Sequence, residues 1–151
     1  TLEEGAIVGR GPAGHLFSPR GDYSNYEQRA KVRINERGNS GSYFRAKPGP
    51  GWPDGYEAQI NASHDDPQRT GGLYGLVPVK LAPVREDQWF ELRVRCIDEK
   101  AGTHVTIWVN DVITADYLDA ERRHASGHVA LQQHIDATEV LFKAVQAREL
   151  K

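Results

Sequence analysis

Two short runs of alternating residues place carboxylate, amide and imidazole side chains on one face of an extended chain. The polar faces carry Glu57, Gln59 and Asn61 in residues 56–61 and His128, Gln132 and His134 in residues 127–134. Such groups form directional hydrogen bonds without a large net charge. Sugars are bound in this way, often with an aromatic ring against their C–H face. The two runs therefore indicate a sugar site, and a plain solvated sheet surface is the alternative.

Two further polar residues lie close to these runs in the sequence. Asn39 is flanked by Gly38 and Gly41, which allow turns with positive φ, and we interpret it as a residue that positions hydroxyls or as part of a simple turn. Arg45 ends a segment with two aromatic residues. We expect its guanidinium either to point into a cleft and bind a carboxylate or sugar hydroxyls, or to form an ion pair with Glu57.

The three tryptophans are candidates for a sugar platform. Trp52 lies in the Pro- and Gly-rich segment 47–55, which is neither a helix nor a central strand. Its ring is expected to be displayed as a platform or folded over the edge of the fold. Trp108 falls on the polar side of its run and is expected to be a second platform or a cover for a loop, whereas Trp89 is expected to pack in the core or at an edge.

A divalent metal ion is the one possible cofactor that the residues indicate. His64, Asp65 and Asp66 follow the Glu57 run directly, and together with His134 they contain the donor types that ligate divalent ions. Their spacing matches no standard metal motif. The alternative is an acidic turn that ends at Pro67.

The elements that must position these residues are β-strands, because period-two alternation dominates the chain. The clearest run, residues 26–34, alternates apolar and charged side chains as a half-buried antiparallel strand does. We also predict strands at 5–8, 42–46, 55–61, 73–77, 90–96, 104–110, 112–114, 127–133 and 139–147. Residues 116–125 are expected to form a short helix or an irregular loop.

About nine or ten short strands with frequent turns predict an all-β fold, a sandwich of two antiparallel sheets or a jelly roll. A closed barrel is the main alternative. No repeat or linker divides the sequence, so residues 1–151 are predicted to form one domain. Cys96 alternates with apolar residues and is expected to lie in the core.

Composition excludes several classes of function. Nineteen Lys and Arg against 21 Asp and Glu give a net charge of −2, which argues against nucleic acid as a partner. No segment approaches the ~20 apolar residues that cross a bilayer, so no membrane insertion is expected. One cysteine excludes an internal disulfide, and nucleotide-binding loops and the G-x-S-x-G and H-E-x-x-H motifs are absent. The chain has no Met, and we expect it to be part of a longer protein with additional domains.

Five segments together resemble the 3-keto-disaccharide hydrolase family, and the resemblance extends over roughly Gly5 to Leu150. The segments are GNSGSYFR at 38–45, GYEAQI at 55–60, TGGLYG at 70–75, GHVALQQH at 127–134 and VLF at 140–142. The resemblance implies a concanavalin A-like jelly roll, a bacterial origin and an extracytoplasmic location. It also implies a carbohydrate substrate, an oxidised disaccharide or glycoside with a ketone at C3.

The resemblance further implies a mechanism. A C3 ketone acidifies the C2 proton, so that a base can remove it, the C1 group is eliminated and water adds. Glu57 and His134 are then the expected base or acid, and Arg45 and Gln59 are expected to clamp the ketone or hydroxyls. A divalent ion near His64 would stabilise the enolate instead. A non-catalytic carbohydrate-binding module and a structural or adhesion domain are the competing hypotheses.

Overall fold

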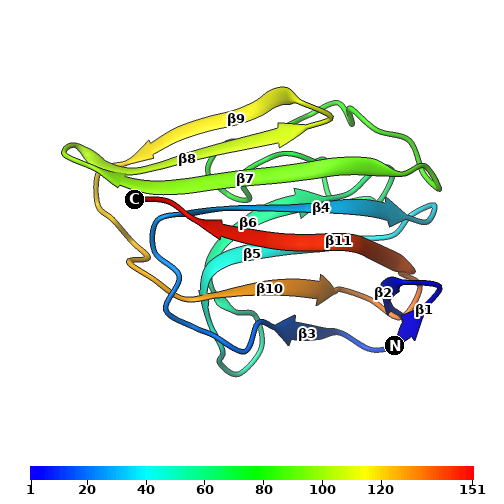
Figure 1. Cartoon of the computed structure of the whole chain (residues 1–151). Helices are drawn as coiled ribbons and strands as arrows, with labels where there is room; N and C mark the ends of the chain where they lie inside the picture. Colours follow the sequence, from blue (N-terminus) through cyan, green and yellow to red (C-terminus); the bar gives the residue numbers. More distant parts are fainter.

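The chain forms eleven antiparallel strands and no helix, in a computed structural model that describes all of residues 1–151 (Figure 1). The strands are β1 (Leu2–Glu3), β2 (Ala6–Gly9), β3 (Gly14–Phe17), β4 (Tyr26–Ile34), β5 (Ser40–Lys47), β6 (Asp54–Ile60), β7 (Phe90–Glu99), β8 (Gly102–Val109), β9 (Val112–Asp119), β10 (His128–Gln133) and β11 (Val140–Glu149). No element is a helix long and apolar enough to span a membrane.

The strands form two sheets, which confirms the predicted all-β sandwich and not the closed barrel. The larger sheet has seven strands in the order β1-β2-β11-β4-β7-β8-β9, and the smaller has four in the order β3-β10-β5-β6. Neighbours in space are often distant in sequence, as with β11 between β2 and β4. Figure 1 shows β5, β6, β10 and β3 as a separate layer from β4, β7 and β11.

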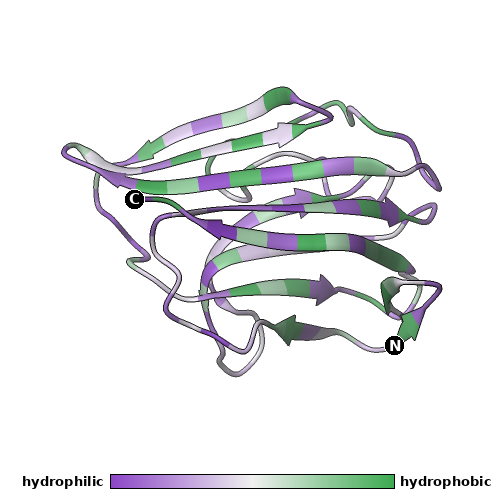
Figure 2. Ribbon diagram, viewed as in Figure 1, coloured by the Kyte–Doolittle hydropathy of each residue, from purple (hydrophilic) through white to green (hydrophobic).

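The core lies between the sheets, where the apolar residues of the alternating runs meet. Ala30, Val32 and Ile34 of β4 face it from the larger sheet, and Phe44 and Tyr56 face it from the smaller one. Figure 2 shows the alternation as bands along β7. Cys96 belongs to this core, as predicted.

Two local expectations are wrong, and two short strands, β1 and β3, were not predicted. Residues 73–77 form only isolated bridges, between Leu73 and Val77 and between Leu73 and Ala58, so this segment is a loop that covers the β6 edge. The first part of 116–125 is neither a helix nor a loop, because β9 continues to Asp119 and pairs with β8. The short strand β3 was not predicted, since Gly14–Phe17 has too few residues to show a period.

Candidate functional site

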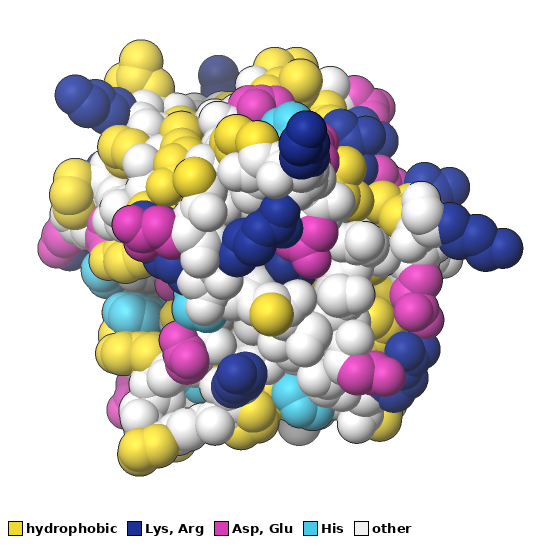
Figure 3. Space-filling view, turned by 90° about the vertical axis from the view of Figure 1, so that its left-hand side faces the viewer, with side chains coloured by type: hydrophobic (Ala, Val, Ile, Leu, Met, Phe, Trp, Pro, Cys, Tyr) yellow, Lys and Arg dark blue, Asp and Glu magenta, His cyan; other side chains and the backbone are white.

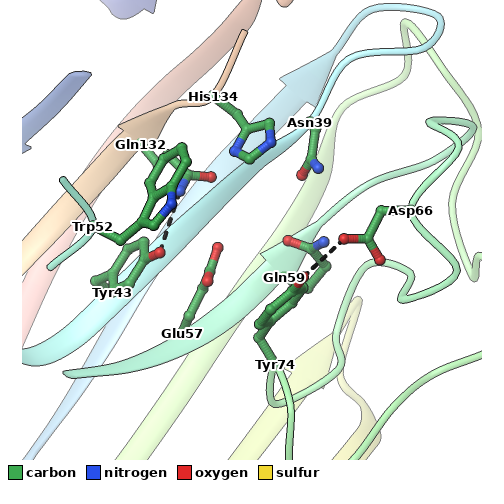
Figure 4. Close-up of a pocket in the computed structure, with 9 residues that line it drawn as sticks. All are labelled: Asn39, Tyr43, Trp52, Glu57, Gln59, Asp66, Tyr74, Gln132 and His134. Carbon is green, nitrogen blue, oxygen red and sulfur yellow. Dashed lines mark hydrogen bonds between the residues drawn. The ribbon is translucent and has the colours of Figure 1, made fainter. Parts of the chain in front are cut away.

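A pocket opens on the outer face of the four-stranded sheet, away from the core. It has a volume of about 120 Å³. Its lining residues are Asn39, Tyr43, Trp52, Glu57, Gln59, Asp66, Tyr74, Gln132 and His134 (Figure 4). They come from β5, β6, β10 and the adjoining loops, and they bring the two polar runs together.

Strand register explains why these side chains meet. Tyr43 of β5 pairs with Glu57 of β6, and Gly41 pairs with Gln59 one step further along. On the other side of β5, Tyr43 pairs with Ala130 of β10. Residues directly opposite each other in a ladder project to the same face, so the alternation of three strands delivers one polar group after another to the pocket.

Glu57 lies half-buried at the floor of the pocket between Tyr43 and Gln59 (Figure 4). The pKa of its carboxyl group is raised to about 7, mainly by burial and in smaller part by the negative charge of Asp66, while a hydrogen bond with Tyr43 acts in the opposite direction. The Tyr43 hydroxyl also accepts a 3.2 Å hydrogen bond from Gln132 Nε2. Near neutral pH, Glu57 can therefore take up or release a proton, as a general base or acid must.

Gly41 provides the space that the Glu57 carboxylate occupies. A Cβ atom at position 41 would lie 2.1 Å from Glu57 Oε1 and 2.8 Å from its Cδ. No side chain can be accommodated there unless the carboxylate moves. The glycine in the sequence GNSGSYFR is thus explained by the position of Glu57, because its own backbone does not require positive φ.

Replacing Gly41 by alanine is expected to lower catalytic efficiency about 100-fold, because displacement of a catalytic group by ~1 Å has effects of that size. Stability should fall little, since alanine is the better residue in a strand interior. The measurement is kcat/KM together with the melting temperature. Gly14→Ala on β3 is the matched control, because the nearest heavy atom to its added Cβ is 3.9 Å away. Equal activity of Gly41→Ala and the control would contradict this role of Gly41.

Trp52 and His134 form one wall of the pocket. Their rings stack with centroids 4.9 Å apart and an interplanar angle of 16°, and His15 of β3 lies edge-on to Trp52 at 5.6 Å. Burial, aided by the nearby His64, lowers the pKa of His134. The Trp52 ring remains 53% exposed, so it forms the pocket rim as well as a support for His134.

Two buried polar atoms at the pocket have no hydrogen-bond partner. They are Oε1 of Gln132 and Nδ1 of His134. Buried polar groups are nearly always paired, so an unpaired acceptor and an unpaired ring nitrogen at the same pocket are unusual. Gln132 and Gln59 are both almost fully buried, which fixes their amides in place.

The loop after β6 closes the opposite side of the pocket. Asn61 is fully buried beneath it, and its Nδ2 donates to the backbone oxygens of Asp66 (3.0 Å) and Gln68 (2.9 Å). Asn61 therefore shapes the loop and does not face the pocket as its position in the alternation suggested. The loop places Asp66 where its carboxylate accepts a 3.0 Å hydrogen bond from the Tyr74 hydroxyl (Figure 4).

The metal site expected at His64 lacks a cluster of side chains that could coordinate an ion. No group of three or more His, Cys, Asp or Glu side chains is placed to hold an ion. The rings of His64 and His134 are 6.1 Å apart, and His64 Nδ1 already accepts a 3.0 Å hydrogen bond from the Asp66 backbone. The donor set does not fit a divalent ion, and we derive no chemical step through one.

The structure corrects the expectation for Arg45. Its side chain is fully buried at the other face of the sheet and contacts neither the pocket nor Glu57. The cause is a β-bulge between Phe44 and Lys47, where Arg45 adopts a φ of 49° and breaks the alternation. Ala46 takes the outward position next to Tyr43 instead.

Trp108 and Trp89 both lie away from the pocket. Trp108 is on the outer face of the larger sheet with the Arg93 guanidinium 4.3 Å above its ring, so it covers no loop and faces no sugar pocket. Trp89 is 40% exposed and lies beneath Lys143, outside the core.

Three pocket residues were not predicted as sugar contacts: Tyr43, Tyr74 and Asp66. Tyr43 carries a signal that could have revealed it, because it lies two positions beyond Gly41 in an alternating run. Tyr74 and Asp66 carry none, since only the path of the loops brings them to the pocket. Asn39, Trp52, Glu57, Gln59, Gln132 and His134 do line it together, and their roles remain predictions.

Comparison with known proteins agrees with this geometry. The model of the 3-keto-alpha-glucoside-1,2-lyase-like domain matches residues 1–148. None of the curated proteins compared with the chain matches it.

Solved structures share the fold at low identity. A candidate glycosyl hydrolase from Parabacteroides distasonis superposes with a TM-score of 0.83 at 16% identity, covering 99% of this chain and 89% of that one. The carbohydrate-binding module CBM66 of Bacillus subtilis gives 0.67 at 17% identity, covering 94% and 86%. The Caenorhabditis elegans galectin LEC-6 gives 0.53 at 13% identity, covering 96% of each chain. These likenesses confirm a concanavalin A-like sandwich.

Proposed function

The chain belongs to the 3-keto-alpha-glucoside-1,2-lyase-like domain family, and we propose that its pocket binds a 3-keto-glycoside and cleaves the C1–O bond by elimination. The observation that carries the proposal is the half-buried Glu57, whose raised pKa suits proton transfer at neutral pH. Amides, hydroxyls and the Asp66 carboxylate surround it, and no Lys or Arg lines the pocket. A neutral sugar ring is the ligand that fits such a lining.

In the proposed reaction the Glu57 carboxylate removes the C2 proton, which the C3 ketone has made acidic. The electron pair forms an enolate and then the C1–C2 double bond as the C1–O bond breaks. The leaving oxygen takes a proton, from protonated Glu57 or through the neutral His134 ring. Water then adds across the double bond, with hydroxyl at C1 and hydrogen at C2, and gives the free 3-keto sugar.

The amides and Tyr43 are assigned to charge stabilisation. Burial and the neighbouring Glu57 raise the pKa of the Tyr43 phenol, so its hydroxyl stays protonated and can donate to the ketone or enolate oxygen. Asn39 and Gln59 are almost fully buried and are held in fixed orientations. Fixed donors need no reorganisation as negative charge develops on the substrate oxygen.

The pH dependence of activity should report Glu57. A base is active when deprotonated, so kcat/KM is expected to rise with pH through about 7 and level off above it. Titration of His134 is not expected to cause a second change in kcat/KM near neutral pH, because burial lowers its pKa. The measurement is kcat/KM between pH 5 and 9. A flat profile across the region around pH 7 would exclude Glu57 as the base.

The direct test is an assay on a 3-keto-disaccharide and on its unoxidised parent in deuterium oxide. We expect cleavage of the oxidised sugar only, with deuterium at C2 of the product, because the proton at that carbon is lost and regained. Cleavage of both sugars at similar rates, or retention of the original C2 proton, would reject the elimination mechanism.

A non-catalytic carbohydrate-binding module is the second candidate, and the likeness to CBM66 favours it. It predicts binding of a sugar with no product after long incubation. Here Trp52→Ala would weaken binding while Glu57→Gln would leave it nearly unchanged, whereas the lyase proposal places the larger effect at Glu57.

A further inference from the structure

The outer sides of β4, β7 and β11 form a second polar surface, on the opposite layer from the pocket. We call it the basic face. It consists of Arg29, Lys31, Arg33, Arg93, Arg95, Lys143 and Arg148, with Glu27 and Glu91 as its acidic members. Of the 19 basic and 21 acidic residues of the chain, 12 and 19 lie elsewhere. The basic face is therefore positive although the protein as a whole is slightly negative.

Other parts of the surface mix the two signs. The end of the sandwich in Figure 3 shows Lys and Arg interspersed with Asp and Glu. An even mixture is what solubility alone favours. The concentration of one sign on the central strands of the larger sheet needs a different explanation.

Like charges lie directly opposite each other on this face. Arg29 of β4 pairs in register with Arg93 of β7, and Lys31 of β4 pairs with Lys143 of β11. Like charges in such positions destabilise a sheet, because their Cβ atoms are only about 5 Å apart. Folding does not require these residues, since any strand-forming side chain would serve on a solvated face. Their cost to stability indicates a function.

Several of these cations have unused binding capacity. Lys31, Arg95 and Lys143 form no ion pair, and Arg29 donates to the neutral Gln146 at 2.9 Å. Arg33 and Arg93 reach acidic partners only at 3.4 Å.

The Nε atoms of Arg33 and Arg93 are buried and have no hydrogen-bond partner. Neither Nε is accessible to a docked ligand, so an anion would be bound through the outer Nη atoms of these guanidinium groups. The charge of the face points to an anionic partner.

We propose that the basic face binds an anionic polysaccharide. Two pairs of cations, Arg29 with Arg93 and Lys31 with Lys143, are neighbours across adjacent strands at the interstrand spacing of about 4.8 Å. This spacing is comparable to the length of one sugar unit, so neighbouring carboxylate or sulfate groups of an extended chain meet the two cations of a pair. Such binding would hold the protein on a polymer while the pocket on the other layer stays open.

The same face is poorly suited to nucleic acid. Single strands are bound through bases stacked on free aromatic rings. Trp108 is covered by Arg93 at 4.3 Å and Arg95 at 5.5 Å from its ring centroid, and Trp89 lies beneath Lys143 at 5.1 Å. The two tryptophan rings at this surface are thus already in contact with its own cations.

The test compares the intact protein with the double variant Arg29→Thr/Lys31→Thr. Threonine favours strands and removes one member of each like-charged pair. Binding to polygalacturonate and to dextran sulfate is measured by titration calorimetry at low and moderate salt, with neutral dextran and duplex DNA as further probes. The melting temperature of each protein is measured in parallel.

We expect the double variant to lose about tenfold or more in affinity and to show a weaker salt dependence. Its melting temperature should be equal or higher, because the like-charge repulsion is relieved. The matched control is Lys80→Thr/Arg85→Thr, which removes the same charge from an exposed segment outside the face. Tighter binding to dextran sulfate would identify sulfate as the preferred group of the polymer, and tighter binding to polygalacturonate would identify carboxylate.

Three results would overturn the proposal: no binding to either acidic polysaccharide at low salt, an equal loss of affinity in the control variant, or tighter binding to DNA than to both polysaccharides. Because binding is measured without turnover, the proposal stands or falls independently of the activity of the pocket.

Discussion

Replacing Glu57 by glutamine is expected to reduce kcat on a 3-keto-glycoside by about 10²–10⁴-fold, the contribution of a positioned general base. Glutamine has nearly the same shape and can keep a hydrogen bond with Tyr43, but it cannot accept a proton from carbon. KM should change little, because Asn39, Gln59 and Gln132 still line the pocket. The measurement is steady-state kinetics on the oxidised substrate.

The same substitution has a predictable effect on stability, which separates catalysis from folding. The pKa of Glu57 is raised in the folded protein to about 7, so the folded state favours the protonated form. As pH rises from the ordinary Glu pKa toward 7, Glu57 ionises in the unfolded state but stays protonated in the folded state, so the folded protein loses stability. Glutamine does not ionise, so Glu57→Gln should remove this loss. At pH 8 the variant should be as stable as the parent or more stable, by on the order of 2 kcal/mol.

Undiminished turnover by Glu57→Gln would remove Glu57 from the mechanism. Loss of turnover together with a large fall in melting temperature would point to a structural role instead. Glu91→Gln, on the outer face of the other sheet, is the matched control and should leave activity unchanged.

Replacing Arg45 by methionine is expected to destabilise the protein by about 3–5 kcal/mol, as the removal of one partner from a buried charged network does. Arg45 Nη1 donates to Asp98 (3.0 Å) and Thr103 (3.2 Å), and its Nε donates to the backbone of Ser24 (2.9 Å). Methionine fills the space but removes a donor from the backbone oxygens of Ser24 and His124. It leaves Asp98 with only Thr103 (2.7 Å) and Arg122 (3.3 Å). The measurement is the free energy of unfolding from urea denaturation.

A milder variant keeps this prediction testable if the methionine protein does not fold. Arg45→Lys retains the charge but not the fork of donors, and should cost about 1–3 kcal/mol. In either folded variant kcat/KM should remain near the parent value, because Arg45 lines no part of the pocket. Unchanged stability with lost activity would show that Arg45 acts on the substrate, as its place in the sequence first suggested.

The sequence predicted the fold well because alternation is a local property. Residues 26–34 show it with the buried Gln28 as the one exception, and β4 has the same bounds as the predicted strand. The pocket followed from the same rule, since Glu57 and Gln59 project to one side of β6 and Gln132 projects to the same side of β10. A loop such as 61–75 obeys no period, and so the positions of Asp66 and Tyr74 were not predictable.

The sequence by itself determined which side chains share a face of each strand, and hence the all-β class and most of the pocket lining. Only the tertiary structure decided which faces meet, because strand order and register depend on contacts between distant residues such as Tyr43 and Glu57. It also decided where alternation fails. One extra residue in the bulge at Arg45 turned a predicted sugar contact inward, because strand side chains change face at every residue.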